Sequence, residues 1–381
     1  MNEITDANIV EIIEKAIDRS KWEKFKFSDL FENVVEKVVP KNSGLEHYIG
    51  LEHLDSGSLH IKRFGDTSSL IGDKLKIYKG DIIFAKRNAY LKRASIAPFD
   101  AVASAHSLVL RPKEKNVLPE FIPFFLMSEK FWERAIEISV GSLSPTINWK
   151  SLAKQEFLLP PKDQQAKLAE LLWAMDEVIE REKEVFKQVD NLFKVKTKLI
   201  SETKNKKNIR KLKDICLIKD NLRKPINSSE RDLIKGDVPY FGANGLVDYL
   251  NDYIFNEDLV LIAEDGGNFN EFFNREIAYR VSGKSWVNNH AHVLTVKNNS
   301  FPIDWLFYSL VHKNILKHIT GTTRLKLNKS DLENITIWLP QIDEMNILIE
   351  EMQKIDFNRS QINIKLESSQ SLQKSLINQV F

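Results

Sequence analysis

The chain has 381 residues, of which 43% are apolar and 28% are charged, and its formal net charge is +2 at pH 7. This composition excludes an intrinsically disordered chain, and the length exceeds one ordinary hydrophobic core, so we expect two domains. The single Cys216 excludes an intramolecular disulfide and a multi-cysteine zinc site, and apolar runs such as Leu259–Ala263 are too short to span a bilayer. Acidic residues at Glu3, Asp6 and Glu11 are untypical of a secretory or transit signal, so we expect a cytoplasmic protein.

The first half of the chain contains three predicted segments. Residues 1–20 predict a short amphipathic helix with isoleucines on one face. Residues 21–160 carry β-branched and aromatic runs, such as Asp81–Phe84 and Ala101–Leu110, which are typical of strands. Residues 161–207 predict a long helix that begins after Pro160-Pro161, with Asp163 as its N-cap, and ends near Asn205.

The second half of the chain repeats this plan. Residues 208–340 are again rich in strand-like runs, including Leu259–Ile262 and Ala291–Val296. Residues 341–381 predict a second long helix, which begins near Asp343. Each helix has an apolar seam with alternating spacings of three and four, as in two helices that pair. The residues expected in this pairing are Leu168, Leu172, Met175, Ile179, Phe186, Val189, Phe193, Leu348, Met352, Ile355, Ile362 and Leu366. Pairing with helices of a partner protein is the alternative.

The two halves are also related by an internal duplication. Gly141–Asn148 recurs, without a gap and 180 residues later, as Gly321–Asn328. Further upstream, Ala105–Leu110 corresponds to Asn289–Leu294. A period this long indicates a duplicated half-protein rather than a solenoid. We therefore predict an α+β fold, in which two strand-rich domains in pseudo-twofold duplication are separated by two long helices that pair as an antiparallel coiled coil.

Sequence motifs of the common nucleotide-dependent and DNA-modifying enzymes are missing. The sequence contains no Gly-x-Gly-x-x-Gly, no Asp/Asn-Pro-Pro-Tyr/Phe and no Pro-Asp dipeptide. Gly283-Lys284-Ser285 lacks the earlier glycine of a phosphate-binding loop. His290 and His292, with Glu264 and Asp265, offer a possible metal site, although we favour structural or DNA-facing histidines. We therefore expect a chain that is not an enzyme and binds no cofactor or metal itself.

The order of these motifs resembles the specificity (S) subunits of type I restriction–modification systems. The resemblance rests on a strand-rich domain, a Gly-Ser/Thr loop, a Leu-Pro turn and a long helix, all occurring twice. Tyr240–Gly245, Leu261–Asn268 and Trp286–His292 look like motifs of that family's target-recognition domains, as do Tyr48–His53 and Gly80–Phe84 in the first half. The second Leu-Pro turn departs from the family pattern, since Gln341 replaces the second proline.

This resemblance implies a function in defence against foreign DNA. Residues 21–160 and 208–340 would be two target-recognition domains, each reading one half-site of a bipartite double-stranded DNA sequence. Residues 161–207 and 341–381 would be spacer helices that set the gap and dock two methylation (M) subunits. S-adenosylmethionine would bind to the M subunits, and ATP and Mg²⁺ to partner subunits, including the restriction (R) subunits. No membrane partner is implied.

Phosphate contacts supply affinity for DNA and base-edge contacts supply sequence choice. For the first domain the expected DNA-binding residues are Lys62, Arg63, Lys86, Arg87, Asn88, Tyr90, Lys92, Arg93, Ser104, His106, Ser142, Ser144 and Thr146. For the second domain they are Arg223, Lys224, Asn244, Asn268, Lys284, Asn288, Asn289, His290, Thr322, Thr323, Arg324 and Lys326. The basic residues would contact phosphates, and the amides and histidines would lie near base edges.

Three other interpretations remain open at this point. The chain could be the specificity chain of a type II-like methyltransferase–nuclease system. It could be a coiled-coil scaffold with two β-rich protein-binding modules, which would show no salt-dependent affinity for DNA. It could also be a metal-dependent enzyme that uses His290 and His292.

Overall fold

The computed structural model describes residues 19–202 and 207–381. The amphipathic helix predicted for residues 1–20 and the predicted end of the first long helix near Asn205 therefore lie largely outside the described residues. The chain divides into two compact units, which we call unit 1 (Met1–Glu182 with Lys365–Phe381) and unit 2 (Lys183–Ile364). Within the described residues, no helix combines the length and the apolar character that a membrane span requires.

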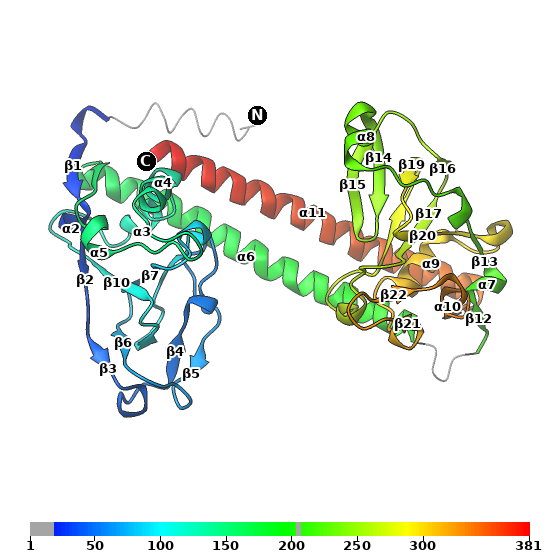
Figure 1. Ribbon diagram of the computed structural model, residues 1–381, viewed down its shortest axis with the longest axis horizontal. Coiled ribbons are helices and arrows are strands. Elements are labelled where there is room, and N and C mark those ends of the chain that lie inside the picture. The colour runs from blue at the N-terminus through cyan, green and yellow to red at the C-terminus, as the bar shows by residue number, and fades with distance from the viewer. Residues whose placement is uncertain (1–18, 203–206) are drawn as a thin grey trace. The chain divides into compact units, whose positions relative to one another are not determined.

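Unit 1 contains three β-sheets (Figure 1). Strand β1 pairs with β11, a second sheet has the order β2-β10-β7-β8, and a third has the order β3-β6-β9-β4-β5. The strands are β1 (Glu23–Lys26), β2 (Phe31–Asn33), β3 (Lys37–Val38), β4 (His47–Ile49), β5 (Gly65–Asp66), β6 (Lys74–Ile77), β7 (Ile82–Ala85), β8 (Ala94–Ile96), β9 (Ala101–Ala103), β10 (Ser107–Pro112) and β11 (Glu156–Leu159). The short helices are α2 (Phe27–Leu30), α3 (Ile122–Phe125), α4 (Glu129–Glu137) and α5 (Trp149–Leu152).

Unit 2 repeats this topology. Strand β12 pairs with β23, a second sheet has the order β13-β20-β17-β18, a third has the order β15-β14-β19-β16, and β21 pairs with β22. The strands are β12 (Ile209–Lys211), β13 (Cys216–Ile218), β14 (Lys235–Gly242), β15 (Gly245–Leu250), β16 (Phe255–Asn256), β17 (Leu259–Ala263), β18 (Ala278–Val281), β19 (Lys284–Val287), β20 (Ala291–Val296), β21 (Ile319–Thr320), β22 (Lys326–Leu327) and β23 (Thr336–Trp338). The short helices are α7 (Leu212–Ile215), α8 (Ser228–Leu233), α9 (Ile303–Leu310) and α10 (Lys329–Leu332).

The duplication is visible in the strand pairing. Each unit has one parallel pair, which joins Tyr48 to Val102 in unit 1 and Tyr240 to Trp286 in unit 2. The continuous strand predicted for Ala101–Leu110 is wrong, because this run forms two strands, β9 and β10, which belong to different sheets. The chain turns between them, where the hydroxyl of Ser104 accepts the backbone amide of His106 at 3.2 Å.

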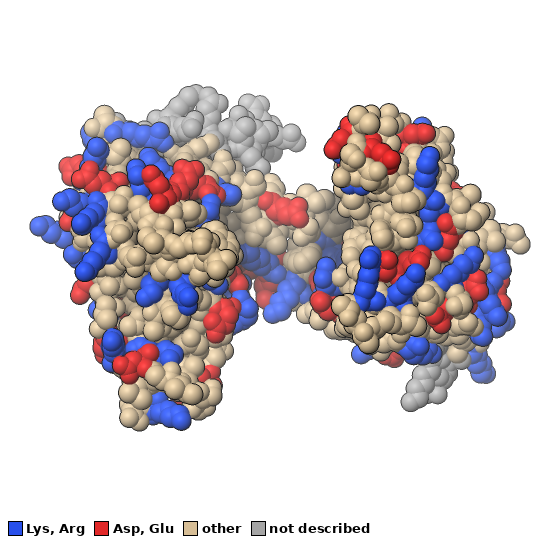
Figure 2. Space-filling model, viewed as in Figure 1, with Lys and Arg blue, Asp and Glu red and all other residues tan. Residues whose placement is uncertain are grey.

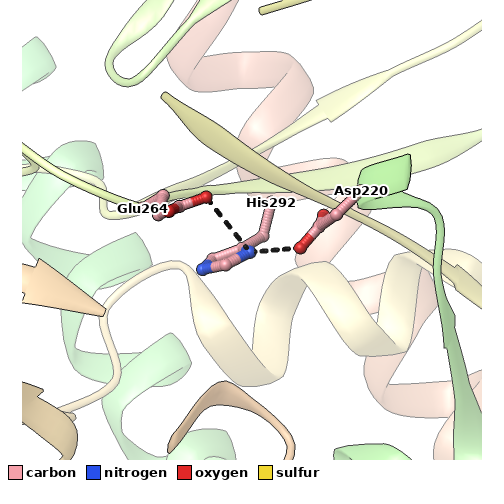
Figure 3. Close-up of side chains that lie close together, drawn as sticks. All are labelled: Asp220, Glu264 and His292. Carbon is pink, nitrogen blue, oxygen red and sulfur yellow. Dashed lines mark hydrogen bonds and ion pairs between the residues drawn. The ribbon is translucent and has the colours of Figure 1, made fainter. Parts of the chain in front are cut away.

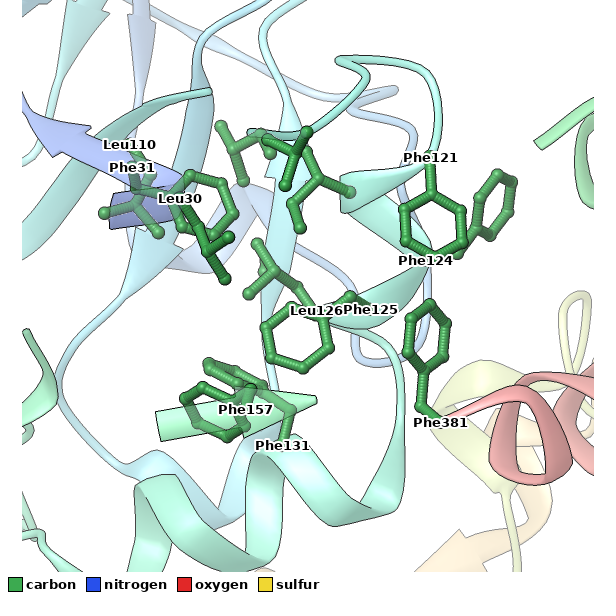
Figure 4. Close-up of a cluster of buried hydrophobic side chains, with 14 of the residues drawn as sticks. Leu30, Phe31, Leu110, Phe121, Phe124, Phe125, Leu126, Phe131, Phe157 and Phe381 are labelled. Carbon is green, nitrogen blue, oxygen red and sulfur yellow. The ribbon is translucent and has the colours of Figure 1, made fainter. Parts of the chain in front are cut away.

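An aromatic core fills unit 1 on one side of the β2-β10-β7-β8 sheet. Phenylalanines from α3, α4 and β11 gather there, and Phe381 joins them from the far end of the sequence (Figure 4). The ring of Phe381 lies 5.2 Å from that of Phe121 and 5.5 Å from that of Phe125, centroid to centroid. A 93% buried aromatic side chain therefore ties residues 365–381 to the N-terminal half of the chain.

The two long helices are α6 (Lys162–Ser201) and α11 (Ile342–Val380), and they lie beside each other within each unit (Figure 1). In unit 1, Leu168 and Leu172 of α6 share the core with Leu376 and Val380 of α11. Each helix thus buries one apolar seam, as the heptad pattern predicts. All twelve residues that were expected in the pairing are buried or half-buried.

Polar contacts between the helices in unit 2 give their direction. Lys196 on α6 pairs with Glu351 on α11 at 2.6 Å, and Asp190 pairs with Arg359 at 3.4 Å. Residues earlier in α6 therefore meet residues later in α11, so the helices run antiparallel. The guanidinium of Arg359 also lies 3.9 Å from the ring centroid of Phe193, which places a cation on an aromatic face inside this pair.

Candidate nucleic-acid interface

In unit 1, three segments from distant parts of the sequence meet at the ends of β7 and β10. We call them loop cluster 1, and they comprise residues 86–88, 104–106 and 141–147. The backbone amide of Ile147 donates to the carbonyl of Lys86 at 2.8 Å. This contact fastens the glycine-containing segment 141–147, predicted from sequence to follow DNA, to the end of the central strand.

In unit 2 the corresponding segments meet in the same way. Loop cluster 2 comprises residues 264–266, 288–290 and 321–327. The backbone amide of Leu327 donates to the carbonyl of Glu264 at 2.7 Å, and the amide of Glu264 donates to the carbonyl of His290 at 2.8 Å. Backbone hydrogen bonds between the segments thus hold the second cluster together.

The two clusters have the same backbone framework. An isolated antiparallel bridge joins Arg87 to Thr146 in cluster 1, and another joins Asp265 to Lys326 in cluster 2. Since Lys326 follows Thr146 by the 180 residues of the duplication, Asp265 occupies the place of Arg87. The duplicated framework therefore carries different side chains, and their charges are opposite at this position.

Cluster 1 is rich in cations. The Nη1 atom of Arg87 lies 3.4 Å from Nε2 of His106, and Nζ of Lys86 donates to the carbonyl of Ala105 at 3.0 Å. Burial, followed by the charges of Arg87, Lys86 and Lys74, lowers the pKa of His106. Burial and the neighbouring Arg87 also lower the pKa of Lys86. Within the described residues, no carboxylate forms an ion pair with any of these four groups.

Cluster 2 carries acids that are neutralised by internal ion pairs. The carboxylate of Glu264 accepts from Arg223 at 2.7 Å and pairs with Lys326 at 3.2 Å. The carboxylate of Asp265 pairs with His290 at 2.8 Å and with Arg324 at 2.9 Å. Burial raises the pKa of Glu264, but hydrogen bonds from Arg223 and Lys326 outweigh it and hold that pKa below its usual value.

Beneath cluster 2, His292 joins three parts of unit 2 (Figure 3). Its side chain is 1% exposed, its Nδ1 lies 2.6 Å from Asp220, and its Nε2 lies 2.8 Å from the carbonyl of Leu327. Both neighbours only accept hydrogen bonds, so both ring nitrogens must donate and the ring is cationic. Burial raises the pKa of Asp220, but the hydrogen bond and charge of His292 outweigh it and hold that pKa low.

One ligand atom from each of Asp220, Glu264 and His292 lies within 4.8 Å of the others, a spacing that would admit a metal ion. However, both nitrogens of His292 already donate to protein acceptors, and Arg223 and Lys326 supply positive charge to Glu264. His290 contacts a different carboxylate, so the two histidines do not converge on one point. The chemistry of this group is that of a buried ion-pair cluster.

Several expected DNA-binding residues of unit 1 lie in cluster 1, and others have partners elsewhere. Those in the cluster are Lys86, Arg87, Asn88, Ser104, His106, Ser142, Ser144 and Thr146. By contrast, Lys62 pairs with Glu180 of α6 at 2.5 Å, and Lys92 pairs with Glu129. Other side chains outside the cluster are those of Arg63, which pairs with Asp55, Arg93, which donates to the carbonyl of Leu51, and Tyr90, which is 57% exposed.

In unit 2 the same division holds. The expected residues that gather in or against cluster 2 are Arg223, Asn244, Asn288, Asn289, His290, Thr322, Thr323, Arg324 and Lys326. Asn268 instead donates to the carbonyl of Glu276, while Lys224 lies over the ring of Trp286 and Lys284 over that of Tyr253. The 13% exposed Arg223 is bound to carboxylates, so this geometry leaves it poorly placed for the phosphate contact expected from sequence.

Sequence reasoning missed three contributors to these clusters. Lys74 at the start of β6 adds charge to cluster 1, and Asp220 holds His292. Asp265 was considered only as a metal ligand, whereas it pairs with two cations. On the face drawn in Figure 2, acidic and basic side chains are intermixed rather than joined in one basic surface. An alignment of the two halves at the bridge residues could have revealed the reversal from Arg87 to Asp265.

Comparisons with known proteins address the family directly. The model of the type I restriction modification DNA specificity domain matches residues 19–191 and again residues 204–368. A putative type I restriction enzyme specificity subunit from Haemophilus influenzae is 40% identical over 134 residues, which are 34% of this chain and 32% of that protein. The HindI specificity subunit of the same organism is 24% identical over 172 residues, 42% of this chain and 36% of that protein. These matches span about a third of the length of each relative.

Solved structures share the fold. The S subunit of a type I restriction–modification system from M. genitalium superimposes with a TM-score of 0.64 at 17% identity, covering 94% of this chain and 96% of that one. A chain from a study of complex assembly and conformational transition of the type I system gives 0.52 at 17% identity, with 94% and 97% covered. The predicted α+β fold and the predicted resemblance are thereby confirmed. Because the family model matches both halves, the protein belongs to the family of type I restriction–modification specificity subunits.

Proposed function

We propose that this chain is the non-catalytic DNA-recognition subunit of a type I restriction–modification complex. In this proposal each unit reads one half-site of a bipartite double-stranded DNA target. The two long helices set the gap between the half-sites and dock the methylation subunits. The work takes place in the cytoplasm, where such a complex meets foreign DNA.

The observation that carries this proposal is the pair of loop clusters. Each one lies at the end of the same four-stranded sheet, on a matching backbone framework, yet the side chains differ. Cluster 2 presents Asn289 and His290 next to Asp265, a set that suits hydrogen bonding to base edges. Cluster 1 presents Arg87 and His106 instead. Two frameworks with different contents suit a reader of two different half-sites.

The proposed docking of methylation subunits is supported by the outer face of α6. Val185, Leu192 and Leu199 recur every seven residues and are 46%, 45% and 56% exposed. A stripe with this spacing lies along one side of a helix and suits packing against further helices. At about 1.5 Å per residue, helices of 40 and 39 residues are each about 60 Å long, which suits a spacer of fixed length.

The chemistry of the complex would belong to its other subunits. S-adenosylmethionine would bind to the methylation subunits, and ATP and Mg²⁺ would serve the restriction subunits. The polar groups of both loop clusters, such as His292, are engaged in hydrogen bonds and ion pairs that suit recognition. The chain would therefore contribute sequence choice and geometry, without a bond-making step.

Methylation mapping tests this proposal. The chain is co-expressed with its adjacent methyltransferase gene, and methylated bases are mapped across a plasmid. We expect a split motif with a gap of fixed length. A single contiguous motif would contradict two independent readers. No new methylation, with the methyltransferase shown to be active and bound, would reject DNA recognition and favour a scaffold.

A single-residue variant tests the assignment of the halves. Asn289→Ala removes an exposed amide from cluster 2, so it should relax one half-site and leave the other unchanged. Asn270→Ala, at an exposed position of the same unit outside the cluster, is the matched control. If both half-sites degraded together in the Asn289 variant, the assignment of one reader to each unit would be wrong.

A further inference from the structure

The charge reversal between the two loop clusters separates their interactions with an anion. In cluster 2, Asp265 pairs with His290, and Arg324 pairs with the same carboxylate, so an internal acid satisfies both cations. In cluster 1 the corresponding position is Arg87, and the histidine of the turn is His106. The first framework therefore brings positive groups together without the acid that the second one has.

The contact between Arg87 and His106 shows what this arrangement lacks. A guanidinium can only donate hydrogen bonds, so Nε2 of His106 must accept the one from Arg87 over 3.4 Å. The imidazole in this contact is therefore neutral, with its proton on Nδ1. A weak nitrogen acceptor thus occupies the place where an arginine ordinarily meets an oxyanion.

The surroundings of this contact add only positive charge. Lys86 comes from the same strand end as Arg87, and Lys74 comes from the start of β6. Segment 141–147, which completes the cluster, reads Gly-Ser-Leu-Ser-Pro-Thr-Ile and carries no charged side chain. The charged groups that act on His106 are thus all cations.

We propose that loop cluster 1 is a phosphate clamp, in which a backbone phosphate of DNA inserts between Arg87 and His106 and His106 takes up a proton. The phosphate oxygens then accept from Arg87 and from the newly protonated Nε2, while Lys86 and Lys74 supply further positive charge. Cluster 2 has no such proton uptake, because Asp265 already pairs with His290. This inference rests on the proposed function and adds that the two half-sites are held by chemically different means.

A pH dependence follows from the clamp. In the free chain, burial and three cations lower the pKa of His106, whereas a bound phosphate places a negative charge beside the ring and raises it. Between the free and the bound value, binding takes up a proton. The affinity for DNA should therefore rise as the pH falls through the bound-state pKa, and level off below the free-state pKa.

Calorimetry on the complex with co-expressed methylation subunits measures this proton directly. A duplex that contains the mapped target is titrated in buffers of different ionisation enthalpy. We expect uptake of up to about one proton per complex for the wild type, and a loss of that uptake in His106→Gln. Inorganic sulfate, a phosphate analogue that does not titrate near neutral pH, is added as a competitor to distinguish DNA from a small oxyanion.

Salt titrations supply an independent readout. Arg87→Gln should reduce the slope of log K against log salt by about 1, since one phosphate contact is lost, and Arg87→Lys should retain most of the slope. Lys115→Gln, at an exposed position of unit 1 outside the cluster, is the matched control and should leave the slope unchanged.

The outcomes separate the clamp from the proposed function. If the duplex binds and neither the proton uptake nor the salt slope depends on His106 and Arg87, the clamp is rejected while DNA recognition stands. If sulfate is bound with proton uptake and the duplex is not, the site takes a small oxyanion and the assignment to DNA is overturned. If the wild-type complex does not bind the mapped duplex at all, the proposed function itself fails.

Discussion

Arg359 on α11 is the residue of unit 2 whose replacement we expect to be most informative about how the strand-rich part is fastened to the helices. Its guanidinium pairs with Glu276 at 2.8 Å and with Asp356 at 3.1 Å through Nη2, and with Asp190 of α6 at 3.4 Å through Nη1. It also lies 3.9 Å from the ring centroid of Phe193. One side chain thus joins both helices to the segment before β18.

The change Arg359→Met retains most of the volume and removes the charge. The Arg359 side chain is 18% exposed, and the three carboxylates are between 16% and 37% exposed, so solvent screens them only in part. Removing one partner of a fully buried pair costs 3–5 kcal/mol, and an exposed pair is worth 1 kcal/mol or less. For this intermediate burial we expect a loss of about 2–3 kcal/mol in the free energy of unfolding of unit 2.

Acidification should partly relieve this loss. Burial raises the pKa of Asp356, and the charges of Arg359 and Arg280 oppose that rise. Without Arg359 the pKa of Asp356 rises further, so the folded state binds more protons than the unfolded state over a wider range. Stability then increases as the pH falls through the folded-state pKa, and the deficit of the variant should shrink below neutral pH.

Urea unfolding followed by hydrogen exchange of peptides from each unit measures these changes separately. The matched control is Lys365→Met, since the Lys365 side chain is 72% exposed and pairs with Glu182 at 3.2 Å, and it should cost less than about 1 kcal/mol. An unchanged transition of unit 2 in the Arg359 variant would refute the reasoning, as would equal losses for the variant and the control.

Two further predictions concern unit 1. Phe381→Ala removes a buried ring that contacts Phe121 and Phe125, so it should destabilise unit 1 by about 3 kcal/mol in the same exchange experiment, and an unaltered unit 1 would show that the ring is dispensable. The hydrogen bond from His60 to Asp176 of α6 raises the pKa of His60, so its contribution is fully present below the unfolded-state pKa and is lost as the pH rises through the folded-state value. Thermal unfolding at a series of pH values should show this decline in the wild type, and a decline of the same size in Asp176→Asn would contradict it.

Secondary structure and duplication are the features that local patterns in the sequence determined. The heptads of residues 161–207 and 341–381 predicted two paired helices, because an apolar seam with a spacing near 3.5 has to be buried against another helix. The constant offset of 180 residues predicted the repeated half, and the family model matches both halves. The single strand predicted for Ala101–Leu110 was wrong, because the turn at Ser104 depends on a side-chain hydrogen bond that alternation of apolar residues does not reveal.

The electrostatic character of the two loop clusters was decided only by the tertiary structure. Asp220 and His292 are 72 positions apart, and Arg87 and Asp265 become equivalent only when their bridges to Thr146 and Lys326 are seen. Counting basic residues along the chain therefore selected Arg223, which is occupied by internal carboxylates, together with Arg87, which forms no ion pair within the described chain. A charge is available for a ligand only if no opposite charge lies beside it, and the long-range packing of strand ends determines which charges become neighbours.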